Sequence, residues 1–405
     1  MPDATQEPLG TLARRIFAAQ QRSPYRQTPT DLAKAMRIRF RLLLDLGRIE
    51  SFARRNAAIV RRERGISIPR QLVQLLRLAL VERVDPATYY AHHLYDAPLG
   101  LGEIAYYLSR TEMKNGLYSL LRLLRRDDPN FDLALTDKLQ FTETARRAGL
   151  PIAPIFGVAA EGRWLTAPLP LEGDLFVKPV HGRGAAGARA FHAVGDGSYQ
   201  ARDGGVCSAR DLLERIAEDS QRQAVLLTRR LRNHAEIADL AVESLITFRV
   251  FTCMDASGTP VVTHAMLRTL CKLEPDWHTD EEFAAAIDLE TGRLQQMCGD
   301  ANLAPDAWWD RHPKTGAQVT GRIIAHWPEL AALAVRAHRA FSGRMIIGWD
   351  LALAPEGAML LEGNSKPDTH FLQRVHRRMI GRSPMAPLIR HHLNAAESLL
   401  RKPPI

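Results

Sequence analysis

The sequence contains few cysteines and no long hydrophobic run. Its 405 residues include four cysteines, none of them in a CxxC pair. This disfavours a disulfide framework or a structural zinc site, and a reducing cytoplasm is the expected location. No apolar run approaches the roughly 18 residues of a membrane span, and the first residues lack a signal-peptide pattern. The Walker A pattern, the protein-kinase catalytic loop and a Ser/His or Cys/His nucleophile arrangement are also absent, which excludes those routes to ATP or covalent catalysis.

The positive charge is unevenly placed. The net charge is +9, and residues 1–130 hold 22 Lys and Arg against 13 Asp and Glu, so the rest of the chain is neutral. Solvated helix faces explain this surplus most simply. Docking to a negatively charged partner, or peripheral contact with an anionic membrane at its inner face, is the alternative. The arginines are dispersed and no aromatic-rich recognition motif accompanies them, which disfavours nucleic acid as a partner.

The spacing of apolar residues divides the chain into two parts. Residues 1–130 are predicted to be a basic helical region, with apolar positions three and four apart. From residue 131 onward short β-rich runs alternate with helices, which predicts a mixed α/β or α+β domain. The expected helices cover 12–20, 30–64, 70–84, 136–148, 208–219, 327–341 and 387–400. The expected strands cover 155–158, 174–180, 224–228, 247–253, 261–267, 345–353 and 359–362.

A β-hairpin over residues 345–364 carries the strongest chemical signal. Its two apolar strands flank the turn Pro355–Gly357. Asp350 lies on the first strand, and Glu362 and Asn364 lie two apart on the second, so these two face the same side. Carboxylate and amide oxygens on adjacent strands are the hard ligands that Mg²⁺ or Mn²⁺ prefers. The hairpin therefore predicts a metal site, with ordinary turn chemistry as the alternative.

A lysine and a glycine loop follow one another in residues 174–187. Lys178 lies in an apolar strand, where a polyphosphate could compensate its charge; the alternative is an edge-strand lysine that reaches solvent. Gly182, Gly184 and Gly187 match GxGxxG, but the residues that follow alternate like a strand instead of opening a helix. We expect the loop to join two antiparallel strands and to cover phosphates with backbone amides. A plain hairpin turn and a dinucleotide fold stay open.

Two arginines stand among β-forming residues in predicted strands. Arg249 is predicted to hold a phosphate or carboxylate, and a buried salt bridge is the alternative. Arg268 offers the same choice on a weaker pattern. The scattered histidines His264 and His338, together with His370, fit ordinary packing or surface roles.

Taken in order, these motifs resemble the ATP-grasp superfamily, and within it the sugar-transfer-associated branch related to α-L-glutamate ligases. The resemblance covers about residues 130–395. No single piece is specific, but their combination and order are. The matching segments are Asp137–Lys138, Ala148–Pro151, Phe176–Pro179, Gly182–Gly187, Asn233–His234, Ala238–Leu240, Thr247–Val250, Gly348–Asp350 and Leu361–Asn364.

The resemblance implies an α+β, ATP-grasp fold in which two α+β subdomains clamp ATP, preceded by the helical region 1–130. Residues 131–230 would supply the lysines and the glycine loop, and residues 231–405 the metal site. Lys138 and Lys178 would neutralise phosphate charge, and Arg249 would stabilise the transferring phosphoryl group. ATP and Mg²⁺ are the implied cofactors.

The implied activity is that of an ADP-forming carboxylate–amine (or thiol) ligase. A substrate carboxylate would attack the γ-phosphate, and an amine would displace phosphate from the resulting acylphosphate. Small-molecule, peptide or glycan substrates are all compatible with this scheme. An ATP-grasp phosphotransferase and a non-catalytic nucleotide-binding scaffold are the alternatives.

Two departures from the family pattern bear on substrate binding. The strand expected to hold adenine ends in Thr228–Arg230, where many relatives have Glu or Gln, so adenine contacts would be made by the backbone and the ribose contact falls to Glu236. Residues 269–280 also lack the polar Asp-Asn and Gly-Gly stretch expected near the acceptor. A different substrate or weakened catalysis would follow from this second change.

Overall fold

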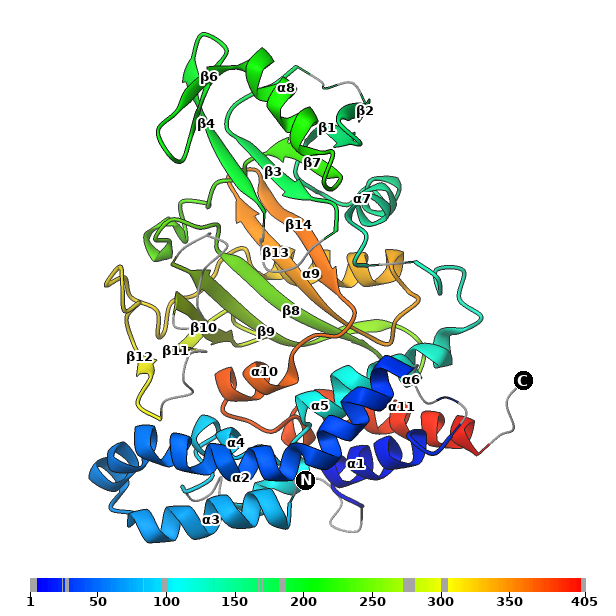
Figure 1. Cartoon of the computed structure of the whole chain (residues 1–405), viewed down its shortest axis with the longest axis vertical. Coiled ribbons are helices and arrows are strands. Elements are labelled where there is room, and N and C mark those ends of the chain that lie inside the picture. The colour runs from blue at the N-terminus through cyan, green and yellow to red at the C-terminus, as the bar shows by residue number, and fades with distance from the viewer. Residues whose placement is uncertain are drawn as a thin grey trace.

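In a computed structural model, the chain forms three tiers: a small sheet, a larger sheet below it, and helices beneath both (Figure 1). The residues that the structure describes are 6–23, 25, 29–82, 84–96, 101–133, 135–166, 168, 170–181, 187–271, 281–299 and 305–401, with the backbone alone at 29–45, 111 and 115. No helix in this part of the chain is long and apolar enough to span a bilayer. All four cysteines are free thiols.

Helices make up the lowest tier, as the apolar spacing predicts. Helix α3 begins before the predicted residue 70 because Pro69 is tolerated in a first turn, where its missing N–H has no helical partner. The long helix α2 ends at Gly65, whose φ of +67° favours glycine. The elements of this tier before residue 130 are α1 (Leu9–Gln20), α2 (Pro29–Arg64), α3 (Ile68–Leu80), α4 (Ala87–Ala91), η1 (Leu101–Tyr106), α5 (Arg110–Glu112), η2 (Met113–Leu117), α6 (Tyr118–Arg122) and η3 (Leu123–Arg125).

The small sheet is antiparallel, in the order β2-β1-β7-β3-β4-β5-β6, and α8 (Ala209–Asp219) covers one face. Along β3 burial alternates, so Leu175 and Val177 pack with α8 while Lys178 faces the other side. Lys178 therefore points away from the core between the small sheet and α8. We call the small sheet with α8 the small lobe, and the large sheet with the helices that pack on it the large lobe. The strands are β1 (Ile155–Ala160), β2 (Arg163–Thr166), β3 (Leu175–Pro179), β4 (Arg189–Gly195), β5 (Ser198–Ala201), β6 (Val206–Ser208) and β7 (Val225–Arg229).

The large sheet is also antiparallel, in the order β12-β11-β10-β9-β8-β13-β14. Helix α9 (Trp327–Ala340) packs on one face, and α10 (Thr369–Val375) and α11 (Met385–Leu400) pack on the other. Every residue of β13 is buried because both faces are covered. The strands are β8 (Thr247–Met254), β9 (Pro260–Leu270), β10 (Glu282–Ile287), β11 (Leu294–Gly299), β12 (Trp308–Trp309), β13 (Ile346–Ala354) and β14 (Gly357–Asn364).

The first helix of the chain shares a hydrophobic core with the large sheet. Leu9, Leu12 and Ile16 of α1 belong to the same buried cluster as Phe251 of β8 and Leu393 of α11. Burial of this apolar surface holds the start of the chain against its end. The division of the chain at residue 130 stays a prediction.

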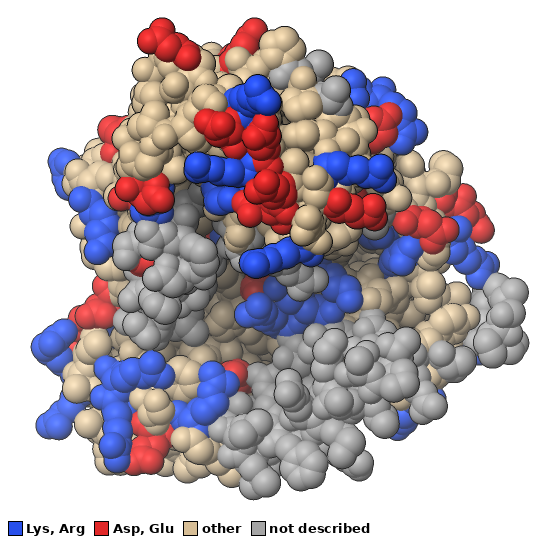
Figure 2. All heavy atoms as spheres, turned by 45° about the horizontal axis from the view of Figure 1, so that its top comes forward, with Lys and Arg blue, Asp and Glu red and all other residues tan. Residues whose placement is uncertain are grey.

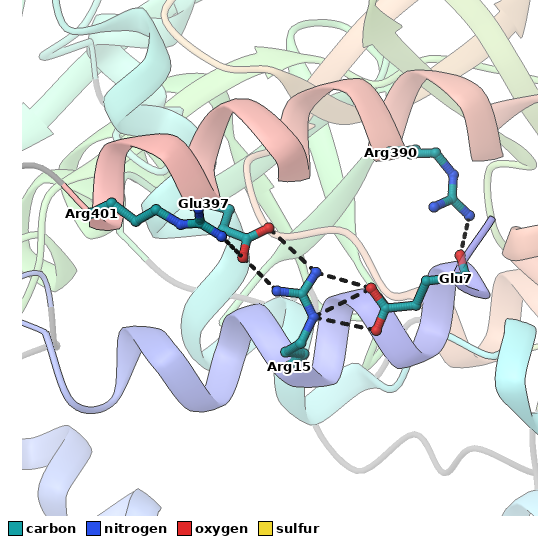
Figure 3. A network of polar contacts seen from close by, with 5 residues as sticks. All are labelled: Glu7, Arg15, Arg390, Glu397 and Arg401. Atoms are coloured by element: carbon teal, nitrogen blue, oxygen red, sulfur yellow. Dashed lines mark hydrogen bonds and ion pairs between the residues drawn. The ribbon is translucent and has the colours of Figure 1, made fainter.

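Charged side chains reinforce this contact between α1 and α11 (Figure 3). Arg15 lies 2.9 Å from Glu7 and 2.5 Å from Glu397, and Arg401 lies 3.0 Å from the same Glu397. Arg390 donates a hydrogen bond of 2.6 Å to the backbone oxygen of Glu7. These exposed pairs add little free energy each, but they specify how the two helices lie together.

Candidate functional site

The predicted hairpin is present and brings its polar residues together. Strands β13 and β14 pair antiparallel with Asp350 opposite Glu362 and Gly348 opposite Asn364. The amide nitrogen of Asn364 lies 3.4 Å from Asp350 Oδ2 and 3.5 Å from Glu362 Oε1. Turning this amide would present its oxygen to the same point. The three side chains therefore form one cluster of oxygen donors, and their role as metal ligands stays a prediction.

Arg249 makes the buried salt bridge that was the alternative at the sequence level. It lies opposite Asp350 in the β8–β13 register, and its Nε and Nη2 bind both carboxylate oxygens, with Nη2 2.8 Å from Oδ2. Arg268 on β9 pairs with Glu282 of β10 and lies 3.8 Å from Asp350. Two arginines thus approach Asp350 from the large sheet.

The two carboxylates of the hairpin differ in their electrostatic state. Burial alone would raise the pKa of Asp350, but the charges of Arg249 and Arg268 outweigh it and the pKa is lowered. The pKa of Glu362 is raised, first by the low-dielectric surroundings and then by the Asp350 charge. Glu362 is nevertheless open to solvent, whereas Asp350 is buried. Among the described residues, Asp350 is paired with Arg249, whereas Glu362 makes no ion pair within 4 Å.

Two predicted lysines lie near this cluster: Lys178 on the small sheet, and Lys138 on a helix whose Phe141 and Ala145 pack in the core of the large sheet. Lys138 begins α7 (Lys138–Arg147), which Asp137 caps, and its Nζ lies 3.4 Å from the backbone oxygen of Val180. Burial lowers the pKa of Lys178, and the Lys138 charge lowers it further, while Glu362 opposes the shift. Burial also lowers the pKa of Lys138, again against Glu362. Lys138, Lys178 and Glu362 therefore lie within electrostatic reach of one another.

A pocket lies between the small sheet and the edge strand β14 of the large sheet. Ile155, Leu226 and Leu361 give it apolar walls, and Lys178 and Thr228 add polar atoms. A backbone hydrogen bond of 2.7 Å from Leu360 to Pro151 holds the lobes together beside it. Figure 2 shows a hollow between the upper and lower parts of the molecule, with Lys and Arg side chains gathered beside it.

The glycine loop joins antiparallel strands, as expected. Strands β3 and β4 pair antiparallel, with Leu175 opposite Phe191. Gly187 has a φ of +77°, and a Cβ there would lie 3.1 Å from Pro179 Cγ, so glycine lets this end of the loop pass close to β3. Gly182 and Gly184 lie outside the described residues, as do residues 272–280 of the altered stretch. Phosphate covering by this loop stays a prediction.

Glu236 does not line the pocket. Its carboxylate accepts a hydrogen bond from the Ala325 N–H and lies 2.6 Å from His326 Nδ1. Among the described residues, one set of three His, Cys, Asp or Glu side chains has possible metal-binding atoms that all lie within 4.8 Å of one another: His234, Glu236 and His326. The Glu236 N–H already bonds His234 Nδ1 at 3.2 Å, so this nitrogen and the carboxylate are engaged. These hydrogen bonds join residues 234–236 to residues 325–326, which explains why the three side chains lie together. The ribose contact of Glu236 stays a prediction.

The N-terminal region contacts the segment that follows the hairpin, and the sequence analysis did not predict this contact. Asp368, four residues after Asn364, caps α10, and its Oδ2 lies 2.9 Å from Arg110 and 3.2 Å from Lys114. Burial lowers the pKa of Lys114, Asp368 opposes this shift, and the charges of Arg110 and Arg249 add to it. No motif marks Arg110 or Lys114 in the sequence, because their partner is remote in the chain.

The N-terminal region also contacts Pro367, which lies beside Arg249. The Tyr118 hydroxyl donates to the Pro367 backbone oxygen at 3.1 Å. A Cβ on Gly348 would lie 2.7 Å from Pro367 Cβ and 3.5 Å from Arg249 Cδ, so Pro367 and Arg249 share the space over this glycine. The N-terminal region therefore holds the segment that adjoins the arginine of the site.

Comparison with known proteins gives one family. Residues 124–382 match the family described as sugar-transfer associated ATP-grasp. No curated protein sequence matches the chain. Similar solved structures include a biotin carboxylase complex from Campylobacter jejuni, with 12% identity, a TM-score of 0.39, and 67% of this chain and 47% of that one covered.

Two further structures are similar at the same low level. The VanG D-Ala:D-Ser ligase from Enterococcus faecalis has 12% identity and a TM-score of 0.38, with 65% of this chain and 62% of that one covered. The ATP-grasp ligase PsnB has 17% identity and a TM-score of 0.34, with 66% and 62% covered. The chain thus spans less than two thirds of the length of each of these proteins.

The family match extends over more than half of the chain. It confirms the family resemblance and the α+β, ATP-grasp fold predicted from the sequence. The chain belongs to the sugar-transfer associated ATP-grasp family.

Proposed function

We propose that this protein is an ATP- and Mg²⁺-dependent ligase that joins a carboxylate to an amine through an acylphosphate. One observation carries the proposal: Lys138 and Lys178 lie within electrostatic reach of Glu362 of the hairpin, beside one pocket. Membership of the ATP-grasp family supports ATP as the nucleotide. The similar ligase structures are too distant to add to the argument.

The pocket is suited to a nucleotide. Ile155, Leu226 and Leu361 offer apolar surface to an adenine ring. Lys178 lies at the same pocket, and Lys138 lies within electrostatic reach of it. Burial lowers the pKa of both amines, so the protein by itself disfavours their charged forms. Phosphate oxygens would replace the water that stabilises these charges in solution. The proposed nucleotide therefore lies between the lobes with its phosphates toward Glu362.

The donor set of the hairpin fits Mg²⁺ or Mn²⁺. Asp350, Glu362 and Asn364 supply only oxygen ligands once the amide is turned, and burial, followed by the charge of Asp350, raises the pKa of Glu362. These three residues would hold the ion, which when bound screens phosphate charge and orients the phosphoryl group. Arg249 is fixed by Asp350 next to the same point. It is the residue we assign to the charge that develops on the transferred phosphoryl group.

The proposed reaction has two steps. A substrate carboxylate oxygen attacks the γ-phosphorus, the bond to the β-phosphate oxygen breaks, and ADP leaves. The amine nitrogen then attacks the acylphosphate carbon, the C–O bond breaks, inorganic phosphate leaves with the electron pair, and the amine loses a proton to solvent. Small-molecule, peptide and glycan substrates all fit this scheme. The protein supplies charge and position, and none of its side chains needs to form a covalent bond.

Hydroxylamine tests the proposal, because it is a small nucleophile that can replace the amine. With Mg²⁺·ATP and a panel of carboxylic acids, at least one acid should give a hydroxamate with ADP and phosphate in equal amounts. Lys178→Ala and Glu362→Gln should lose this activity. A stable phosphorylated product without hydroxamate would instead establish a phosphotransferase. Nucleotide binding without acid-stimulated ADP release would establish a scaffold, and AMP with pyrophosphate would refute γ-phosphoryl activation.

A further inference from the structure

Helix α3 and the residue after it expose an unusual amount of apolar surface. Val73 is 65% exposed, Leu76 41%, Leu80 49% and Val81 68%. These four are among nine large hydrophobic side chains that are exposed in the described part of the chain, and they lie within nine consecutive residues. A cluster of this kind marks an interaction surface more often than a scattered set does.

The exposed residues lie on one side of the helix. Val73, Leu76 and Leu80 are spaced by three and four positions, which places them on one face. The other face is already buried, because Leu75 and Leu78 pack in a core cluster with residues of α2 and α4. A helix that packs on one neighbour needs one apolar face, and α3 has two. Figure 1 shows α3 at the outer edge of the lowest tier, away from both sheets.

The surroundings of the exposed face are strongly basic. Residues 46–82 contain eight arginines, three glutamates and no lysine or aspartate. Arg70 and Arg77 lie next to the apolar side chains on the same side of α3, and both are exposed. Arg77 lies 3.8 Å from Glu82, and Arg70 makes no ion pair with the residues that the structure describes. Two exposed arginines, Arg70 and Arg77, therefore border the apolar face.

The charge decides which partner fits. A second copy of the chain would place one arginine-rich surface against another, and the two would repel. An acidic protein would satisfy the arginines, but the apolar side chains stand on the convex side of a single helix at the edge of the molecule. An anionic bilayer satisfies both features, since aliphatic side chains enter the acyl region and arginines bind headgroup phosphates.

We propose that α3 docks this protein onto an anionic membrane surface, with Val73, Leu76 and Leu80 inserted and Arg70 and Arg77 at the headgroups. The proposal goes beyond the ligase activity and does not depend on it. The membrane contact that the sequence analysis considered for residues 1–130 is thereby assigned to α3.

Vesicle binding of the full chain tests the proposal. The probes are vesicles of phosphatidylcholine alone and vesicles with phosphatidylglycerol added, assayed by co-sedimentation at low and at physiological salt. The wild type should bind the anionic vesicles, more tightly at low salt. The triple variant Val73→Ser, Leu76→Ser and Leu80→Ser should lose about tenfold or more in binding at unchanged charge. Arg70→Gln with Arg77→Gln should weaken binding mainly at low salt.

A matched control uses exposed valines of the small lobe. Val194 and Val206 are 50% and 58% exposed, so Val194→Ser with Val206→Ser removes similar surface elsewhere and should leave binding unchanged. A second readout is independent of the serine variants: a polarity-sensitive dye on Leu76→Cys, in a Cys207→Ser background, should shift to the blue with anionic vesicles. The remaining three cysteines are buried.

Four results would overturn the proposal. The first is a wild type that does not bind anionic vesicles at low salt. The second is a triple serine variant that binds these vesicles as well as the wild type. The third is binding to soluble polyglutamate as tight as binding to the vesicles, which would indicate a charge-only contact with an acidic partner. The fourth is a wild type that is dimeric in solution and becomes monomeric in the triple variant, which would show that a second copy covers α3.

Discussion

The two sheets of this protein treat their charged residues in opposite ways. In the large sheet the buried cations are paired with carboxylates of neighbouring strands: Arg249 binds Asp350 directly opposite it, and Arg268 binds Glu282 diagonally across β9 and β10. In the small lobe, burial lowers the pKa of Lys178, and the carboxylate that opposes this shift, Glu362, belongs to the large lobe.

This difference separates charges that hold the fold from charges that await a ligand. A paired arginine is compensated by its own sheet, so removing either partner leaves an uncompensated charge in the interior. Burial disfavours the charged amine of Lys178 in the empty protein, and this free energy would be regained when phosphate binds. Removing a paired charge in the large lobe should therefore lower the free energy of unfolding. Removing the lysine of the small lobe should instead lower the affinity for the nucleotide.

The largest effect is expected at the hairpin. Asp350→Asn and Glu362→Gln should each lower Mg²⁺·ATP turnover by about 100-fold or more, because each removes a negative ligand. Asp350→Asn should also lower the free energy of unfolding by about 3 kcal/mol or more, because Arg249 loses its buried partner. Glu362→Gln should leave stability unchanged or raise it, because it relieves repulsion with Asp350. Urea unfolding and ADP release measure both effects, and equal destabilisation by the two variants would contradict the comparison.

The next effect concerns the lysine of β3. At about a hundredfold excess over its Kd, Mg²⁺·ATP should stabilise the wild type by about 3 kcal/mol. Lys178→Met should abolish most of this shift and should not lower the melting temperature without ligand, since burial disfavours the charged amine. Arg249→Met is the control from the other sheet, and it should lower the melting temperature without ligand. An unchanged ATP shift in Lys178→Met would make this a structural lysine.

Acid should act on a buried polar network of the large lobe. Burial lowers the pKa of His338 to about 4. Its Nδ1 lies 2.7 Å from Thr252 Oγ1, which also accepts a hydrogen bond from the Trp349 indole at 2.8 Å. The unfolded chain takes up a proton near pH 6.5 and the folded one only near pH 4, so stability falls as pH falls through this window. The loss at this group is about 3 kcal/mol.

His338→Gln removes this titration, so the stability of the variant relative to wild type should improve between pH 6.5 and pH 4.5. Urea unfolding at several pH values measures the difference. Parallel curves for the two proteins would show that His338 does not carry the acid sensitivity. Other buried histidines, such as His376, leave some sensitivity in the variant.

The smallest effect is expected where the N-terminal region meets the site. Lys114→Met should lower the free energy of unfolding by less than about 1 kcal/mol, because Arg110 continues to pair with Asp368. Asp368→Asn should cost more, since it leaves both cations without that carboxylate while an Asn can still cap α10. Denaturant unfolding compares the two, and an equal loss would mean that Lys114 alone carries this contact.

Local patterns predicted much of the fold. The seven strands expected from residue 155 onward are all present, with ends within three residues, and so is the antiparallel connection after β3. Strands β10 and β11 were not expected. The sequence Glu282–Ile287 is rich in alanine and has helical propensity, yet it forms a fully buried central strand. Pairing with β9 and β11 overrides the weak local preference.

By itself, the sequence determined most of the elements, their order and the grouping of Asp350, Glu362 and Asn364, because the period of a strand and the length of a hairpin are local properties. Only the tertiary structure decided that Arg249 is paired with Asp350, and that Asp368 receives Lys114 from 254 residues earlier in the chain. It also decided that α3 keeps a second apolar face in solvent. Charge pairing and burial depend on which distant segments come into contact, and no local pattern of residues specifies those contacts.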